Sequence, residues 1–214
     1  MKIKLCGLTR EQDIEAANRC APDFVGFVFA ESRRRISMET ASRFRRMLAP
    51  EIRTVGVFVN APIEQIETLC KEKTITLIQL HGDEDAAYCA EIRRRTGVPV
   101  IRAVRVRSAE QIRQAEGEAC DCLLLDAAAE GAYGGSGTRF DLSLIPPLQK
   151  PFFLAGGLDE NNLIQAAAQC RPWAVDVSSG AETCGLKDAE KMARLTALVR
   201  QWNSAQKLAD TREI

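Results

Sequence analysis

Histidine is nearly absent from this chain, since His81 is the only one among 214 residues. A histidine-rich metal site is therefore excluded, and the eight cysteines form no C-x-x-C pair that would indicate zinc or a redox motif. Excess charge of one sign is absent too, because 29 basic residues balance 29 acidic ones. No long-range field would hold such a protein on nucleic acid or on an anionic membrane. We expect neither as a partner, and no metal.

Long hydrophobic runs are missing as well. No apolar stretch approaches the roughly 20 residues of a membrane-spanning helix, and residues 1–5 lead into a predicted strand without the apolar segment of a signal peptide. A hydrophobic content of 46% is nevertheless enough for one substantial core. We therefore expect a cytoplasmic protein with one domain at residues 1–204 and a polar C-terminal tail at residues 205–214.

Eight short apolar or β-branched runs repeat along the chain, with helical periodicity between them. We expect strands at residues 3–6, 24–29, 54–59, 77–80, 98–104, 122–125, 152–155 and 174–177. We expect helices near residues 10–20, 38–48, 62–72, 85–95, 109–116, 142–149, 159–169 and 188–203. Such apolar strands are typical of a parallel sheet covered on both faces, which a doubly wound open sheet would also satisfy. The count of eight and the lack of an early G-x-G-x-x-G sequence favour an α/β fold of the closed (β/α)8 type, a TIM barrel.

Two residues with proton-transfer chemistry stand where predicted strands end, and in a (β/α)8 barrel those ends form one mouth. Cys6 ends the first strand, and Asp126 ends the sixth. Backbone N–H groups and a helix N-terminus near Cys6 are expected to favour its thiolate, which would make it a base. A carboxyl group such as Asp126 in a partly dry mouth would have a raised pKa and would deliver a proton. A structural cysteine and a loop-capping aspartate are the alternative interpretations.

Glycine-rich strings follow the last two strands, where barrels commonly bind phosphate through backbone N–H groups. Gly156 and Gly157 follow the seventh strand, whereas Ser178, Ser179 and Gly180 follow the eighth. Each string alone is also compatible with a tight turn. Two of them at neighbouring strand ends indicate a phosphate site.

Three further segments offer ligand contacts. One guanidinium of the arginine run at residues 33–35 could clamp a substrate carboxylate, with the other two in solvent. His81, after the fourth strand, would either orient a neighbour or touch the ligand. The loop at residues 132–138, which contains Gly135, could close over the site and offer N–H donors. No lysine ends a middle strand, which disfavours an aldolase that works through a Schiff base.

Seven strings in this order resemble the phosphoribosylanthranilate isomerase family of tryptophan biosynthesis, over about residues 4–202. They are Lys4-Leu5-Cys6-Gly7-Leu8-Thr9, Gly26-Phe27-Val28-Phe29 with Ser32-Arg33-Arg34, Val55-Gly56-Val57-Phe58-Val59-Asn60, Gln79-Leu80-His81-Gly82-Asp83, Tyr133-Gly134-Gly135-Ser136-Gly137, Ala155-Gly156-Gly157-Leu158 and Val175-Asp176-Val177-Ser178-Ser179-Gly180. The resemblance implies a small-molecule substrate and no metal or organic cofactor. The implied reaction is the Amadori rearrangement of N-(5-phosphoribosyl)anthranilate to 1-(2-carboxyphenylamino)-1-deoxyribulose 5-phosphate.

The same resemblance assigns roles to residues. It implies that Asp126 is the general acid that protonates the ribose ring oxygen, and that Cys6 is the base that removes the C2 proton. Arg34 would lie near the anthranilate carboxylate. The loops around Gly135, Gly156 and Ser178 would bind the phosphate.

Two alternatives to this function stay open at the level of sequence. A histidine-pathway isomerase of the same fold performs this rearrangement on an aminoimidazole carboxamide substrate, but that family resembles a two-aspartate design, whereas the first-strand position here is Cys6. The other alternative is a catalytically inactive protein that binds a phosphorylated ligand. Such a protein would not need both Cys6 and Asp126.

Overall fold

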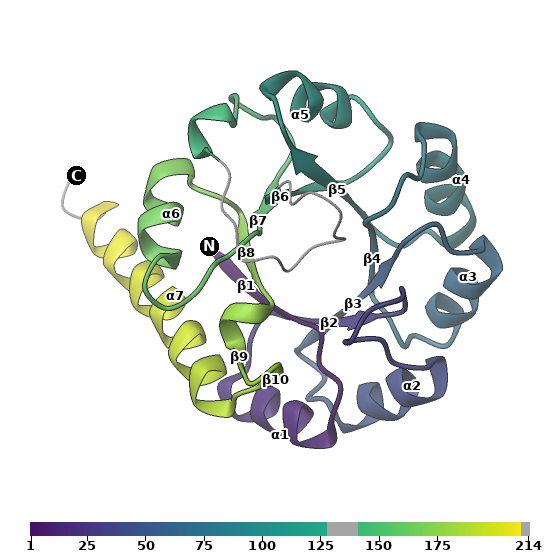
Figure 1. Cartoon of the computed structure of the whole chain (residues 1–214), viewed down its shortest axis with the longest axis horizontal. Coiled ribbons are helices and arrows are strands. Elements are labelled where there is room, and N and C mark those ends of the chain that lie inside the picture. Colours follow the sequence, from purple (N-terminus) through teal and green to yellow (C-terminus); the bar gives the residue numbers. More distant parts are fainter. Residues whose placement is uncertain (128–140, 211–214) are drawn as a thin grey trace.

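The computed structural model describes residues 1–127 and 141–210. Eight parallel strands close into a barrel in chain order, with β8 pairing back onto β1 (Figure 1). The strands are β1 (Lys2–Cys6), β2 (Phe24–Val28), β3 (Arg53–Phe58), β4 (Leu77–Leu80), β5 (Val100–Val106), β6 (Cys122–Ala127), β7 (Phe152–Leu154) and β8 (Ala174–Val177). The closed barrel expected from the eight apolar runs is thereby confirmed.

Helices surround the barrel and cover the outer face of the strands (Figure 1). They are α1 (Glu11–Cys20), α2 (Met38–Met47), α3 (Ile63–Lys71), α4 (Ala86–Thr96), α5 (Ala109–Glu116), α6 (Leu163–Cys170) and α7 (Ala189–Asp210). A one-turn helix η2 (Ser179–Ala181) and a small hairpin of β9 (Glu182–Thr183) and β10 (Leu186–Lys187) connect β8 to α7. Outward-facing strand residues such as Leu5, Ile78 and Leu123 are fully buried under the helices, so this layer supplies most of the hydrophobic stabilisation.

The prediction of a helix at residues 142–149 is wrong. Only one turn forms there, η1 (Leu142–Leu144). Ile145 precedes Pro146 and has an extended backbone with ψ at 111°. A residue before proline is disfavoured in the helical region, and Pro146 and Pro147 supply no N–H for helical hydrogen bonds. The segment therefore cannot continue as a helix.

The C-terminal helix is longer than expected. The helical pattern predicts an end near residue 203, but α7 continues to Asp210. Residues 205–210, expected to form a polar tail, are thus helical, and those at 205–208 are exposed. The extension buries little surface, because Leu208 is 61% exposed.

Strand residues alternate between the barrel interior and the helical layer, because side chains on a strand have a period of two. Near one end the interior is apolar: Phe24 and Phe153 have ring centroids 5.6 Å apart, and Trp173 lies 5.7 and 5.3 Å from them. Further along β1 the same alternation turns Lys4 and Cys6 inward. An apolar floor thus fills the N-terminal end of the barrel, and polar side chains occupy the C-terminal end.

We expect Phe24→Ala to lower the free energy of unfolding by about 3–5 kcal/mol, because it leaves a cavity between two aromatic neighbours. Leu208→Ala is the control, since this exposed residue on α7 should change stability by less than about 0.5 kcal/mol. Urea denaturation followed by circular dichroism measures both variants. Equal losses in the two would contradict the assignment of the aromatic floor to the core.

Candidate active site

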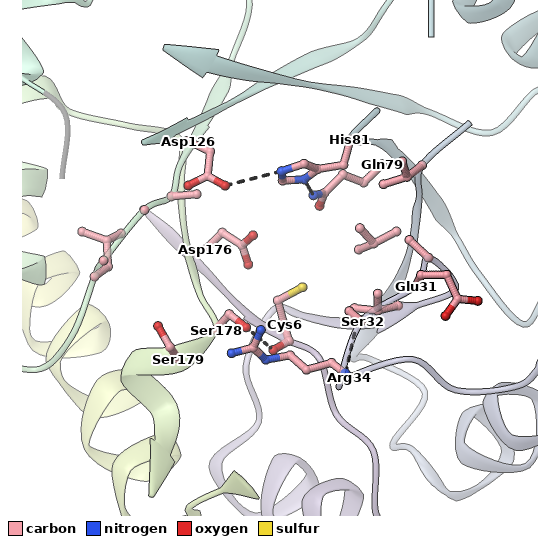
Figure 2. A pocket seen from close by; sticks show the side chains of 18 residues that line it. Cys6, Glu31, Ser32, Arg34, Gln79, His81, Asp126, Asp176, Ser178 and Ser179 are labelled. Atoms are coloured by element: carbon pink, nitrogen blue, oxygen red, sulfur yellow. Dashed lines mark hydrogen bonds and ion pairs between the residues drawn. The ribbon is translucent and has the colours of Figure 1, made fainter. Parts of the chain in front are cut away.

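A pocket opens at the C-terminal ends of the strands (Figure 2). Residues from β1, β2, β3, β4, β6 and β8 line it, together with the loops after β2, β3, β4, β7 and β8. The residues that the sequence placed at the mouth and that line this one pocket are Cys6, Arg34, His81, Asp126, Gly156, Gly157, Ser178 and Ser179. Gly135 lies outside the described residues.

Cys6 ends β1 with its sulfur pointing into the pocket, and only 8% of the residue is exposed (Figure 2). Gly26 on the neighbouring strand makes room for this sulfur, because a Cβ there would lie 2.6 Å from it. Burial raises the pKa of Cys6 above the ordinary thiol value, and the Lys4 and Lys187 ammonium groups oppose that shift without reversing it. The expectation that a helix N-terminus favours the thiolate is therefore wrong, since α1 begins only at Glu11 and burial dominates.

Asp126 lies on the inner face of β6 and is 6% exposed. Its Oδ2 atom is 3.4 Å from Nε2 of His81, and its other carboxylate oxygen points away from the ring (Figure 2). Asp126 and Cys6 lie on different sides of the pocket (Figure 2). A thiol and a carboxyl group placed in this way can exchange protons with two different atoms of one bound molecule.

Three polar side chains that the sequence reasoning did not single out lie inside the barrel. Lys4, Gln79 and Asp176 have exposed fractions of 0%, 1% and 9%. The Lys4 ammonium donates to Asp176 Oδ2 at 2.9 Å and to Gln79 Oε1 at 2.7 Å. Burial by itself would lower the pKa of Lys4, but Asp176 and Cys6 raise it above its usual value, so the ammonium keeps its charge. The sequence does contain an indication of these residues, because each is a polar residue inside a largely apolar strand. A buried polar side chain at such a position is tolerated only when it is paired.

Arg34 is the member of the arginine run that lines the pocket, with a side chain 14% exposed, whereas those of Arg33 and Arg35 are 59% and 53% exposed. Glu182 of β9 accepts hydrogen bonds from Arg34 Nε at 2.7 Å and Nη2 at 3.0 Å. This contact uses one edge of the guanidinium and leaves N–H groups on the other edge for a ligand carboxylate. Lys187 also donates to Glu182, at 2.7 Å. Sequence reasoning missed Glu182 because its partners come from a distant loop.

The loops after β7 and β8 contribute backbone and hydroxyl groups to the pocket. The contributing residues are Gly156, Gly157, Ser178 and Ser179. Gly180 lies beside this lining, and a Cβ on it would overlap the carbonyl oxygen of Leu158. Glycine at this position therefore lets the two loops touch. Backbone N–H groups and hydroxyls of such loops can bind an anion, and the Lys187 ammonium lies close by, donating to the Ser178 carbonyl oxygen at 2.9 Å.

The described parts of the chain lack two features that would suggest other functions. No cluster of three or more His, Cys, Asp or Glu residues within them is placed to hold a metal ion. Across residues 1–127 and 141–210, no helix combines the length and the hydrophobicity required to cross a bilayer.

Comparison with known proteins points to one family. The family model of N-(5'phosphoribosyl)anthranilate (PRA) isomerase matches residues 3–197. A relative from Lachnoclostridium phytofermentans, named N-(5'-phosphoribosyl)anthranilate isomerase, is 44% identical, and the match covers 95% of this chain and 99% of the relative.

Solved structures agree with that match. The phosphoribosyl anthranilate isomerase from Thermus thermophilus is similar with a TM-score of 0.83 and 33% identity, covering 94% of this chain and 100% of that one. A second phosphoribosyl anthranilate isomerase, in complex with reduced 1-(o-carboxyphenylamino)-1-deoxyribulose 5-phosphate, gives a TM-score of 0.76 at 33% identity, covering 92% of this chain and 96% of that one.

We expect Glu182→Gln to destabilise the protein by about 3–5 kcal/mol near neutral pH, because it removes the negative charge that pairs with the buried Lys187 ammonium. Burial would raise the pKa of Glu182, but hydrogen bonds from Arg34 and Lys187 hold it below the ordinary value of 4.5. The unfolded chain therefore binds this proton more tightly, and the stabilisation is complete above pH 4.5 and is lost as the pH falls through the folded-state value.

Urea unfolding near neutral pH and again well below pH 4.5 measures this difference. The gap between the native protein and Glu182→Gln should shrink in acid. A gap that stays constant would show that the charge of Glu182 does not contribute.

Proposed function

Because the chain belongs to the N-(5'-phosphoribosyl)anthranilate isomerase family, we propose that Cys6 and Asp126 carry out the two proton transfers of its reaction. The chain is an isomerase of tryptophan biosynthesis. Its reaction converts N-(5-phosphoribosyl)anthranilate to 1-(2-carboxyphenylamino)-1-deoxyribulose 5-phosphate. One observation carries the residue assignment: a thiol from β1 and a carboxyl group from β6 line the same pocket as the glycine and serine loops after β7 and β8.

The first step opens the ribose ring. Asp126 donates its proton to the ring oxygen, the bond between that oxygen and C1 breaks, and the nitrogen lone pair forms an iminium at C1. Asp126 becomes a carboxylate, with Nε2 of His81 at 3.4 Å from its Oδ2. A low-exposure site strengthens this interaction just as negative charge develops on the carboxylate.

The second step removes the C2 proton. Cys6 first loses its thiol proton to solvent; the thiolate then takes the C2 proton and becomes a thiol, and the electrons of the C2–H bond form a C1–C2 double bond while the iminium nitrogen becomes neutral. The resulting enolamine gives the ketone when the C2 hydroxyl loses a proton and C1 gains one. Burial makes the Cys6 thiolate a strong base, because it raises the pKa of the thiol. The positive iminium next to C2 favours the thiolate at the moment when the base is needed.

The remaining contacts orient the substrate. Arg34 is proposed to hold the anthranilate carboxylate through the guanidinium edge that Glu182 leaves free. The loops at Gly156, Gly157, Ser178 and Ser179 are proposed to bind the phosphate, with Gly180 holding the two loops together. Fixing both charged ends of the substrate places its sugar between the acid and the base.

We further propose a cytoplasmic location. All eight cysteines are free thiols, and five of them are buried. Free thiols persist in a reducing compartment.

Cys6→Ala and Asp126→Asn should each lower kcat by about 100- to 10,000-fold, because each removes one proton-transfer group. Folding should survive both changes. The assay mixes the protein with freshly generated phosphoribosylanthranilate and follows the decay of anthranilate fluorescence. Cys20→Ala is the matched control, since this buried thiol lies on α1 outside the pocket. Near-normal turnover in Cys6→Ala or Asp126→Asn would remove that residue's role.

Arg34→Lys should raise KM by about 10- to 100-fold, because an ammonium cannot contact Glu182 and a substrate carboxylate through two separate edges. Steady-state kinetics in the same assay measures the change. Arg35→Lys serves as the control, because the Arg35 side chain is 53% exposed and pairs with Glu31. An unchanged KM in Arg34→Lys would rule out the clamp.

A further inference from the structure

A continuous chain of polar contacts crosses the barrel interior from β8 to β6. Asp176 Oδ2 and Gln79 Oε1 both accept from the Lys4 ammonium, at 2.9 and 2.7 Å. Gln79 Nε2 lies 2.8 Å from Nδ1 of His81. His81 Nε2 in turn lies 3.4 Å from Oδ2 of Asp126 (Figure 2). The two central links are short, so the orientation of each group constrains the next.

The direction of these hydrogen bonds follows from the donor inventory. An ammonium has three donors and no acceptor, so the carbonyl oxygen of Gln79 must face Lys4. The amide nitrogen of Gln79 is then left facing His81, and it can only donate. Nδ1 of His81 must therefore be the acceptor, which requires a neutral ring with its proton on Nε2.

The opposite arrangement is excluded by burial. A flipped Gln79 amide would place its NH2 group 2.7 Å from the ammonium of Lys4, where no water can separate the two donors. An imidazolium would place an Nδ1–H against the same NH2 group at 2.8 Å. Either conflict leaves a buried donor without an acceptor, which costs more than a lost hydrogen bond.

The neutral ring directs its remaining proton toward the acid. Nε2 of His81 is buried and makes no well-formed hydrogen bond to any of the described residues. An acidic oxygen, Oδ2 of Asp126, lies 3.4 Å from it. Contacts in a catalytic site are often long before the substrate is in place and tighten as charge develops. A donor at Oδ2 favours the acidic proton of Asp126 on the other carboxyl oxygen.

We propose that Lys4 and Gln79 are positioning residues that hold His81 as the Nε2–H tautomer, so that His81 donates to Oδ2 of Asp126 and stabilises the carboxylate formed by ring opening. The proposal rests on the proposed role of Asp126 as the acid. In addition, it assigns a function to Lys4 and Gln79 inside the barrel: they determine which ring nitrogen of His81, the neighbour of Asp126, carries the proton.

The single histidine makes this proposal directly measurable. Protein labelled with 15N in histidine gives signals from His81 alone, and long-range 15N–1H correlation spectra distinguish a protonated from an unprotonated ring nitrogen. In the native protein near neutral pH we expect a protonated Nε2 and an unprotonated Nδ1. A protonated Nδ1, whether in the other tautomer or in an imidazolium, would overturn the proposal.

Gln79→Glu tests the link between Gln79 and the ring. A carboxylate of the same shape accepts from Lys4 and also from the ring, so Nδ1 of His81 should become protonated. Gln165→Glu is the matched control, because this exposed residue of α6 undergoes the same chemical change far from the pocket. If Gln79→Glu folds and Nδ1 stays unprotonated, the link is refuted. If it does not fold, the spectrum of the native protein still decides the tautomer.

Kinetics separates positioning from a merely structural role. Gln79→Met should lower kcat by about 10- to 100-fold and leave KM within about threefold. In a His81→Asn background the same substitution should lower kcat by a much smaller factor, because the part of the effect of Gln79 that passes through the ring is already lost. Equal losses of kcat in both backgrounds would overturn the proposal. Failure of the proposed function is distinguishable, since it would appear as an active Asp126→Asn with the Nε2–H tautomer intact.

Discussion

The buried ammonium of Lys4 is the constraint around which this active site is arranged. A charge with no exposed surface is tolerated only when acceptors surround it, and Lys4 finds them in Asp176, Gln79 and the neighbouring Cys6. These partners come from β8, β4 and β1, which are brought together only when the barrel closes. The positions of the thiol and of the amide next to His81 therefore depend on one ion.

The side chains of each barrel strand alternate between the interior and the outer face, and this alternation places the proposed catalytic residues in one layer. Every second residue of a strand faces the interior, so Cys6 lies two residues beyond Lys4, and His81 two residues beyond Gln79. Cys6, His81 and Asp126 occupy the layer nearest the mouth, and the Lys4 and Gln79 side chains occupy the layer below. Close packing keeps that lower layer rigid, because the aromatic floor of Phe24 and Phe153 fills the space beneath it.

The substrate-facing arginine depends on a segment far away in the chain. Glu182 in the hairpin after β8 holds Arg34 of the loop after β2, and Lys187 of the same hairpin donates to the same carboxylate. Neighbouring strands explain how this is possible, since β1 alone separates β2 from β8 in the closed barrel. An open sheet would leave β2 and β8 far apart, and Arg34 would lose the contact that fixes its free edge.

Local patterns in the sequence determined the eight strands, the order of the barrel and the positions of Cys6, His81 and Asp126 at strand ends, because hydrophobic periodicity is a property of neighbouring residues. The predicted helix at residues 142–149 did not form, because two prolines outweighed the apolar pattern. Tertiary structure alone decided the pKa direction of Cys6, the pairing of Arg34 with Glu182, and the network through Lys4 and Gln79. Burial and hydrogen bonding across strands are set by closure and register, which no single segment of the chain contains.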